Sequence, residues 1–141
     1  MPDKPFLQKK IDMLVGYVAE LTDLITGNEI EAIKQDKPKL YSVERLFQLA
    51  VDLMIDVNTH IINSSDFGTV DDLQSTFKLL GDFNVLEKTF AYKIAPIVSA
   101  RNMLVHRYEK LDKDMFLNNL KRNFGDFKTY MIQIDDYLKK S

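Results

Sequence analysis

Apolar residues recur at helical spacing along almost the whole chain, and no stretch alternates in the way that a strand requires. One series, within residues 6–26, comprises Leu7, Ile11, Leu14, Val18, Leu21 and Ile25. A second series, within residues 42–62, comprises Val43, Phe47, Ala50, Met54, Val57 and Ile61. Each series places its members on one face of a helix, and that face must pack against other helices to leave water. The sequence therefore predicts an all-α protein.

Glycine, proline and capping residues mark the expected ends of the first helices. Gly27 should close the first helix, and Pro38 should end a short helical piece within residues 29–39. Ser42 is the candidate N-cap of the second long helix, whose first turn then contains Glu44.

Three further helices are expected in the second half of the chain, over residues 69–80, 85–106 and 113–139. Gly81 should end the first of them. Pro96 falls inside the next and should either kink that helix or restart it; the apolar spacing keeps its phase across this proline, which favours a kink. These elements predict one domain over residues 1–141, an up-and-down bundle of four long helices plus a short one.

Composition excludes several kinds of site. A chain without cysteine forms no disulfides, iron–sulfur clusters or thiolate metal sites. With His60 and His106 as its histidines, a histidine-rich zinc site would also need carboxylates or a second chain. We expect neither a metal nor a cofactor.

Charge and hydropathy limit the cellular location and the binding partners that we expect. The first residues do not resemble a signal peptide, and no apolar run approaches the ~20 residues that a membrane helix needs, so we expect a cytoplasmic protein without a membrane partner. The net charge of −2 lacks the basic excess of proteins that hold long nucleic acids. Any contact with nucleic acid should be local, brief or shared with a second subunit.

One position in the helix over residues 85–106 breaks the apolar pattern. Arg101 stands where the series calls for an aliphatic side chain; the series comprises Phe90, Ile94, Ile97, Leu104 and Val105. Burying an unpaired guanidinium is costly. Arg101 should therefore pair with an acid across the core, or line a cleft or subunit interface that receives an anion.

Side chains that suit phosphate chemistry surround this arginine. Asn102 and His106 are four residues apart and share a flank of the helix, and Tyr108 returns to the side of Arg101 if the helix continues that far. Arginine can hold a phosphate through two parallel hydrogen bonds, and histidine exchanges protons near neutral pH. Each neighbour also has a structural interpretation: a histidine at the helix C-terminus, a surface amide and a tyrosine at the bundle edge.

The segment from Arg101 to Tyr108, Arg-Asn-Met-Leu-Val-His-Arg-Tyr, resembles the Arg-x-x-x-x-His signature of HEPN ribonucleases. Its extension to the tyrosine, followed by Leu111 and Asp112, is similar to the HepT branch of that family. Residues 42–60 also resemble the family, and the whole resemblance covers roughly residues 40–138.

The resemblance implies a metal-independent endoribonuclease, a homodimer whose motif helices face each other, that acts as the toxin of a toxin–antitoxin pair. Arg101 and His106 would be catalytic and Asn102 would assist. The RNA 2′-hydroxyl would be the nucleophile, with His106 as acid or base and Arg101 stabilising the phosphate. The partner would be a minimal nucleotidyltransferase antitoxin that attaches AMP to Tyr108, the regulatory acceptor.

Two acids on the second long helix have alternative interpretations. Asp52 and Asp56 lie four residues apart and away from the apolar series, which favours a solvated acidic face. Asp56 could instead orient Arg101 or His106, as catalytic histidines often require. His60 should pack at the edge of the core.

Three functions fit this pattern. The first is the RNA-cleaving toxin; the second is a non-catalytic helical module that binds a nucleotidyltransferase or its nucleotide, with Arg101 on the phosphate. The third is a structural bundle with a buried ion pair at Arg101.

Overall fold

Helices provide all the regular structure in the computed structural model, which describes residues 2–141. In chain order they are α1 (Lys4–Thr26), α2 (Ile30–Gln35), α3 (Lys37–Ser64), α4 (Gln74–Asp82), α5 (Lys88–Ile94), α6 (Ile97–His106), the 3-10 helix η1 (Tyr108–Lys110), α7 (Lys113–Arg122) and α8 (Gly125–Lys140). The predicted all-α fold is confirmed.

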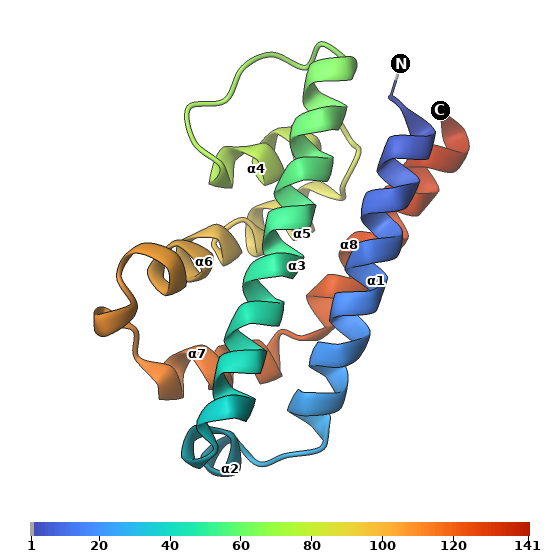
Figure 1. Cartoon of the computed structure of the whole chain (residues 1–141). Coiled ribbons are helices and arrows are strands. Elements are labelled where there is room, and N and C mark those ends of the chain that lie inside the picture. Colours follow the sequence, from blue (N-terminus) through green and yellow to red (C-terminus); the bar gives the residue numbers. More distant parts are fainter. Residues whose placement is uncertain (1) are drawn as a thin grey trace.

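The long helix α3 is the centre of the molecule. It packs along α1, and it also contacts α2, α4 and α6. Figure 1 shows α1 and α8 on one side of α3, with α4 and α6 on the other. Every member of the two apolar series predicted for the first two long helices is buried in the core. Phe47 of α3 makes edge-to-face contacts with Phe116 of α7 and Phe127 of α8, so the two C-terminal helices pack against the same core.

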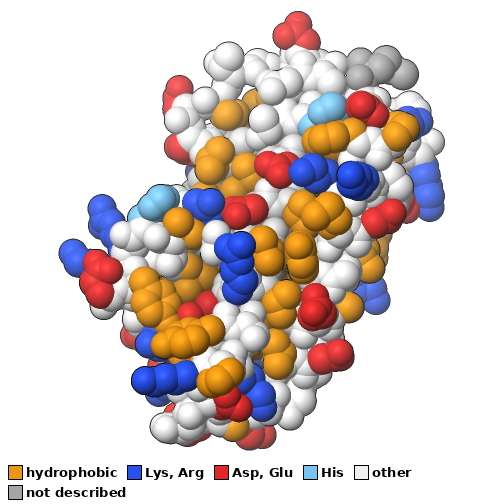
Figure 2. Space-filling view, in the orientation of Figure 1, with side chains coloured by type: hydrophobic (Ala, Val, Ile, Leu, Met, Phe, Trp, Pro, Cys, Tyr) orange, Lys and Arg blue, Asp and Glu red, His pale blue; other side chains and the backbone are white. Residues whose placement is uncertain are grey.

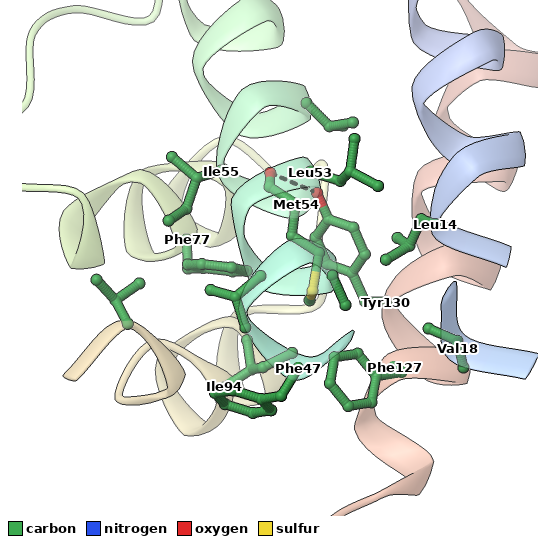
Figure 3. Close-up of a cluster of buried hydrophobic side chains, with 14 of the residues drawn as sticks. Leu14, Val18, Phe47, Leu53, Met54, Ile55, Phe77, Ile94, Phe127 and Tyr130 are labelled. Atoms are coloured by element: carbon green, nitrogen blue, oxygen red, sulfur yellow. Dashed lines mark hydrogen bonds between the residues drawn. The ribbon is translucent and has the colours of Figure 1, made fainter. Parts of the chain in front are cut away.

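A buried polar group fixes α8 against α3 (Figure 3). The hydroxyl of Tyr130, which is fully buried, donates to Asn58 Oδ1 at 2.6 Å and to the Met54 carbonyl at 3.1 Å. The Asn58 amide in turn donates to Thr76 Oγ1 at 3.2 Å. Because a buried polar atom without a partner is costly, these bonds specify how α3, α4 and α8 meet.

The start of α3 differs from the prediction. The helix begins at Lys37, with Pro38 in its first turn and the Asp36 side chain accepting the Lys39 backbone N–H at 3.2 Å. Proline is well suited to a first turn, where its missing N–H has no helical partner. The assignments of Pro38 as a terminator and of Ser42 as the N-cap were therefore wrong.

Two of the predicted long helices are each divided. Residues 95–96 separate α5 from α6, and residues 123–124 separate α7 from α8. At each junction the backbone hydrogen bonds join residues three apart, as in a 3-10 turn. Ser99 N–H donates to Pro96 O at 3.0 Å, and Asp126 N–H donates to Asn123 O at 2.9 Å. The expected kink at Pro96 is thus a break between two helices.

The third predicted helix also begins and ends differently. It starts at Gln74, and Asp72 accepts the Ser75 backbone N–H at 2.8 Å. Gly81 lies inside α4, and a Cβ at this position would be 2.6 Å from the Ala91 Cβ of α5. The glycine permits close packing of α4 and α5 and does not end the helix.

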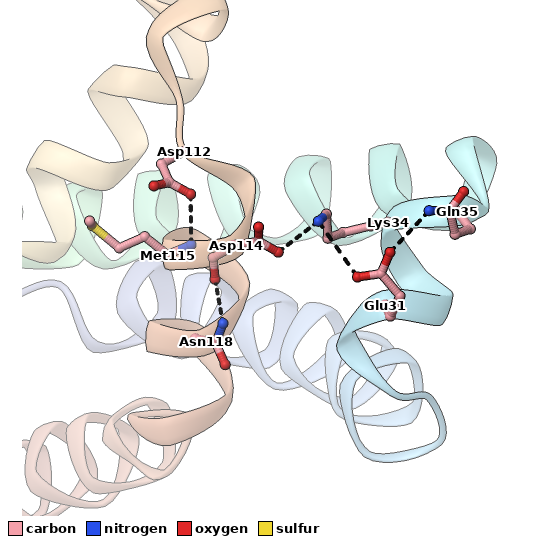
Figure 4. A network of polar contacts seen from close by, with 7 residues as sticks. All are labelled: Glu31, Lys34, Gln35, Asp112, Asp114, Met115 and Asn118. Atoms are coloured by element: carbon pink, nitrogen blue, oxygen red, sulfur yellow. Dashed lines mark hydrogen bonds and ion pairs between the residues drawn. The ribbon is translucent and has the colours of Figure 1, made fainter.

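A polar network fixes the start of α7 (Figure 4). Lys34 of α2 pairs with Asp114 at 2.7 Å and lies 3.6 Å from Glu31, and the bond to Asp114 raises the pKa of Lys34. Asp112 accepts the Met115 backbone N–H at 3.0 Å and so caps α7. The connection after α6 therefore ends at a residue, Asp112, whose position the cap of α7 fixes.

Among residues 2–141, no helix is both long and apolar enough to span a bilayer.

Candidate active site on helix α6

Helix α6 carries the Arg-x-x-x-x-His segment and is the least buried of the helices with ten residues or more. Val98 is its buried residue, whereas the neighbouring α3 buries thirteen. The polar side chains of α6 are therefore arranged by a small number of specific contacts.

Arg101 is held at two of its nitrogens. Its Nε donates to Asp52 Oδ1 of α3 at 2.7 Å, and one terminal nitrogen donates to Asn102 Oδ1 at 3.1 Å. The Arg101 side chain is 19% exposed and that of Asp52 34% exposed. The two alternatives for Arg101 thus occur together in part: it pairs with an acid, and it also lines a cleft, so the pair does not cross the core. The remaining guanidinium N–H groups stay available to an anion.

The cleft beside Arg101 has a volume of about 1020 Å³. Its lining also includes Lys10, Asp56 and His60, so it is bounded by α1 and α3 as well as α6. Figure 2 shows acidic and basic side chains next to one another on this face.

Asp56 and His60 have partners of their own. Asp56 pairs with Lys10 at 3.3 Å, so Asp52, which was interpreted as part of a solvated face, is the acid that orients Arg101. His60 packs against Phe6 with ring centroids 4.7 Å apart, and its Nε2 accepts the Asp3 backbone N–H at 3.0 Å. The prediction that His60 packs at the core edge is confirmed.

His106 is the last residue of α6 and is exposed, as Asn102 is. Within the described residues its side chain has no hydrogen bond or ion pair. Five residues of helix place it about 7.5 Å along the axis from Arg101 and rotated by ~140° around it. The two predicted catalytic side chains thus belong to one helix end but leave it in different directions.

Tyr108 does not continue the helix. The backbone of Arg107 leaves the helical region with φ −140° and ψ 43°, and Tyr108 begins the 3-10 helix η1. Its hydroxyl donates to both carboxylate oxygens of Glu44, at 2.9 and 3.0 Å. The condition on which Tyr108 was expected to return to the side of Arg101, a helix that continues that far, is therefore not met.

Glu44 and Tyr108 perturb each other's titration. Burial raises the pKa of Glu44, and the bond from Tyr108 and the charge of Lys113 counteract part of that effect. Burial, followed by the bond to Glu44, raises the pKa of Tyr108 to about 12. The Lys113 ammonium lies 5.1 Å from the centre of the Tyr108 ring.

The motif segment is thus fixed to α3 at two acids, Asp52 and Glu44. They are eight residues apart, about 12 Å along the helix axis. Sequence reasoning missed both roles. Glu44 lies four residues after buried Leu40 and three before buried Phe47, a signal that becomes visible only once α3 is known to begin at Lys37.

No group of three His, Asp or Glu side chains within residues 2–141 is placed to hold a metal ion. The motif segment over α6 and η1 presents a restrained guanidinium, an amide, an exposed imidazole and a phenol bound to a carboxylate.

Known proteins match this chain in sequence and in fold. A nuclease named tRNA nuclease HepT, from Aphanizomenon flos-aquae, is 33% identical over 95 residues, which cover 67% of this chain and 65% of that protein. The mRNA nuclease HepT of Shewanella oneidensis is 26% identical over 98 residues, covering 70% of this chain and 74% of that one. The structure of the tri-AMPylated Shewanella oneidensis HEPN toxin, in complex with MNT antitoxin, aligns with a TM-score of 0.82 at 22% identity, over 100% of both chains.

A helical bundle with an arginine and a histidine at the end of a late helix defines the HEPN class of proteins. The chain belongs to the HepT-like ribonuclease family, whose model matches residues 14–134.

Proposed function

We propose that this chain is a metal-independent endoribonuclease and the toxin component of a toxin–antitoxin pair. The observation that carries the proposal is the geometry of α6, where Asp52 holds Arg101 at the rim of a cleft and His106 extends into solvent. The membership in the HepT-like family and the relatives named as nucleases support it.

In the proposed reaction the ribose 2′-hydroxyl attacks the adjacent phosphorus and the bond to the 5′-oxygen breaks. His106 removes the proton of the attacking hydroxyl, and a histidine from a second copy protonates the leaving oxygen. General acid–base assistance of this kind contributes about 100- to 10,000-fold. Arg101 stabilises the charge that grows on the phosphoryl oxygens, and Asn102 helps to hold the guanidinium in place.

We propose a homodimer because one chain supplies one such histidine for two proton transfers. The directions of Arg101 and His106 support this assembly, since a second α6 could bring complementary groups to one phosphate. Val105, next to His106, is 38% exposed and would be covered at such an interface. Coexpression of parent and His106→Ala chains should give mixed dimers with impaired cleavage if both copies contribute to one site.

We further propose that the partner is a minimal nucleotidyltransferase that attaches AMP to Tyr108, in a cytoplasmic setting. The solved HEPN toxin of Shewanella oneidensis is AMPylated and bound to an MNT antitoxin, which supports this assignment. Adding AMP would place bulk and negative charge on the segment that follows the proposed active site.

The test is cleavage of a mixed RNA substrate in excess EDTA by the parent and the His106→Ala variant. Cleavage by the parent alone, leaving cyclic phosphate ends, is the expected result. If neither protein cleaves while both are folded and unmodified, the non-catalytic nucleotide-binding module becomes the better assignment.

A further inference from the structure

Glu44 is an unusual buried group. It is 7% exposed and is the one carboxylate among the buried side chains of residues 2–141. It lies on α3 between apolar positions, where an ionised side chain is disfavoured unless it has partners. The proposed cleavage reaction makes no use of it, so its position calls for another explanation.

Both oxygens of Glu44 are directed at one hydroxyl. They accept from the Tyr108 Oη at 2.9 and 3.0 Å, so the phenolic proton lies between the phenol and the carboxylate. Tyr108 itself is partly exposed. A nucleophile within hydrogen-bond distance of a base is the arrangement that activates hydroxyl groups in covalent catalysis.

Building on the proposed AMP transfer to Tyr108, we propose that Glu44 is the general base of that transfer. The acceptor chain would then contribute a catalytic residue to its own modification. Tyr108 Oη attacks the α-phosphorus of ATP, and the new O–P bond forms as the bond to the pyrophosphate oxygen breaks. Pyrophosphate leaves, and the phenolic proton moves to the Glu44 carboxylate.

The electrostatics of the pair agree with this role. A phenol whose pKa is raised to about 12 is not ionised near neutral pH, so its proton must be removed during the attack. Burial raises the pKa of Glu44 and so helps it to keep the proton. Once protonated, Glu44 is neutral and can donate a hydrogen bond to the new phosphodiester, which avoids two adjacent negative charges.

The first test is the initial rate of AMP transfer from ATP by the nucleotidyltransferase partner, followed by intact mass of the full chain. Glu44→Gln preserves the size of the side chain and an oxygen that accepts from Tyr108, but it removes the base. We expect its rate to fall by about 100-fold or more. Glu109→Gln, which removes an exposed carboxylate one residue from the acceptor, is the matched control and should stay close to the parent rate.

Two further variants complete the set. Tyr108→Phe should accept no AMP, which identifies the acceptor. Glu44→Asp keeps a base but moves it back by one methylene, so its rate should lie between those of the parent and Glu44→Gln. Thermal unfolding of each variant shows whether the fold is retained.

The pH dependence of the AMP-transfer rate distinguishes a Glu44 that acts as a general base from a Glu44 that only holds Tyr108 in position. The groups that face this pair are Tyr41 and the Lys113 ammonium. Above the pKa of Glu44 the parent rate should depend little on pH. The Glu44→Gln rate should rise about tenfold per pH unit, because solvent hydroxide must then remove the proton. The ratio of the two rates cancels the pH dependence of the nucleotidyltransferase itself.

The outcomes are distinct. Equal or faster transfer to Glu44→Gln, or parallel pH profiles, would overturn the role of Glu44 while leaving Tyr108 as the acceptor. No transfer to the parent would overturn the acceptor and its base together. RNA cleavage in EDTA needs no nucleotidyltransferase, so it reports on the proposed nuclease independently of both results.

Discussion

Helix α3 supplies two carboxylates to the motif segment, and it holds them in opposite environments. Asp52 lies at the rim of the cleft and pairs with a permanent cation, Arg101, at 2.7 Å. Glu44 is buried and binds a neutral phenol, Tyr108. The first pair keeps both charges in partial contact with water, whereas the second brings one negative charge into the edge of the core.

This difference indicates different tasks. A partly exposed ion pair contributes little to stability but can fix the direction of a guanidinium. A buried carboxylate bound to a hydroxyl is sensitive to the loss of that hydroxyl and to protonation. We therefore expect changes at the Asp52 pair to affect RNA cleavage and changes at the Glu44 pair to affect folding and modification.

The largest effect should come from Arg101→Ala. RNA cleavage should fall by about 100- to 1000-fold, as when one preorganised donor is removed from a developing charge. The free energy of unfolding should change little, because the Asp52 left behind is reached by water. Initial cleavage rates and thermal unfolding measure the two. Arg107→Ala, an exposed arginine just after α6, is the control, and an equal loss in that variant would contradict a specific role for Arg101.

Tyr108→Phe should reduce the free energy of unfolding by about 1–3 kcal/mol, because the buried Glu44 carboxylate loses its hydroxyl donor. Urea denaturation at neutral pH measures the change. Tyr41→Phe alters a tyrosine that is 52% exposed and should have a much smaller effect. Similar losses of unfolding free energy in the two variants would contradict a specific contribution from the hydrogen bonds between Tyr108 and the buried Glu44.

Asp52→Asn should reduce cleavage by about tenfold, equivalent to ~1.4 kcal/mol in the activation barrier, because Arg101 loses its orienting charge. Most of the effect should appear in kcat, since the guanidinium itself remains to attract RNA. Asp56→Asn, which removes the acid paired with Lys10, should leave kcat near the parent value. A larger loss in Asp56→Asn would restore the alternative in which that residue orients the site.

The smallest effect should be the pH dependence of stability in Glu44→Gln. Burial raises the pKa of Glu44 in the folded chain above its usual 4.5, so the folded state favours the protonated acid. The stabilisation from this group is present below the unfolded pKa and is lost as pH rises through the folded pKa. Glutamine does not ionise, so the variant should gain stability relative to the parent as pH rises. Unfolding titrations at several pH values should show the difference disappear in acid.

Much of the fold could be predicted because helical spacing is a local property. The apolar series of α1 and α3 depend on residues three and four apart, and every member is buried. At Pro96 a kink was favoured over a restart, and the break at Asn123 was missed, because the apolar phase continues across each junction. The backbone hydrogen bonds between residues three apart at each junction do not alter the spacing of the apolar residues, so the sequence pattern does not reveal them.

The site could be predicted only in part. The spacing of α6 indicated that Arg101 needs a partner, but Asp52 and Asp56 share a face of α3 and differ by about 6 Å along its axis. The choice between them therefore depends on where α6 crosses α3, which the tertiary packing determines. Glu44 was assigned to a first turn because the true start of α3, capped by Asp36, was not recognised.

The shallow burial of α6 has an evolutionary consequence. Apart from the buried Val98 and the partly buried Ile97, Ala100 and Leu104, which pack against the core, the positions of α6 contribute little to folding, so selection for a stable bundle hardly constrains them. Drift can then remove the arginine or the histidine and leave a protein that still folds and still displays the same surface to its partners. Such inactive proteins would remain stably folded, so a new ligand specificity could evolve on them without any change to the core.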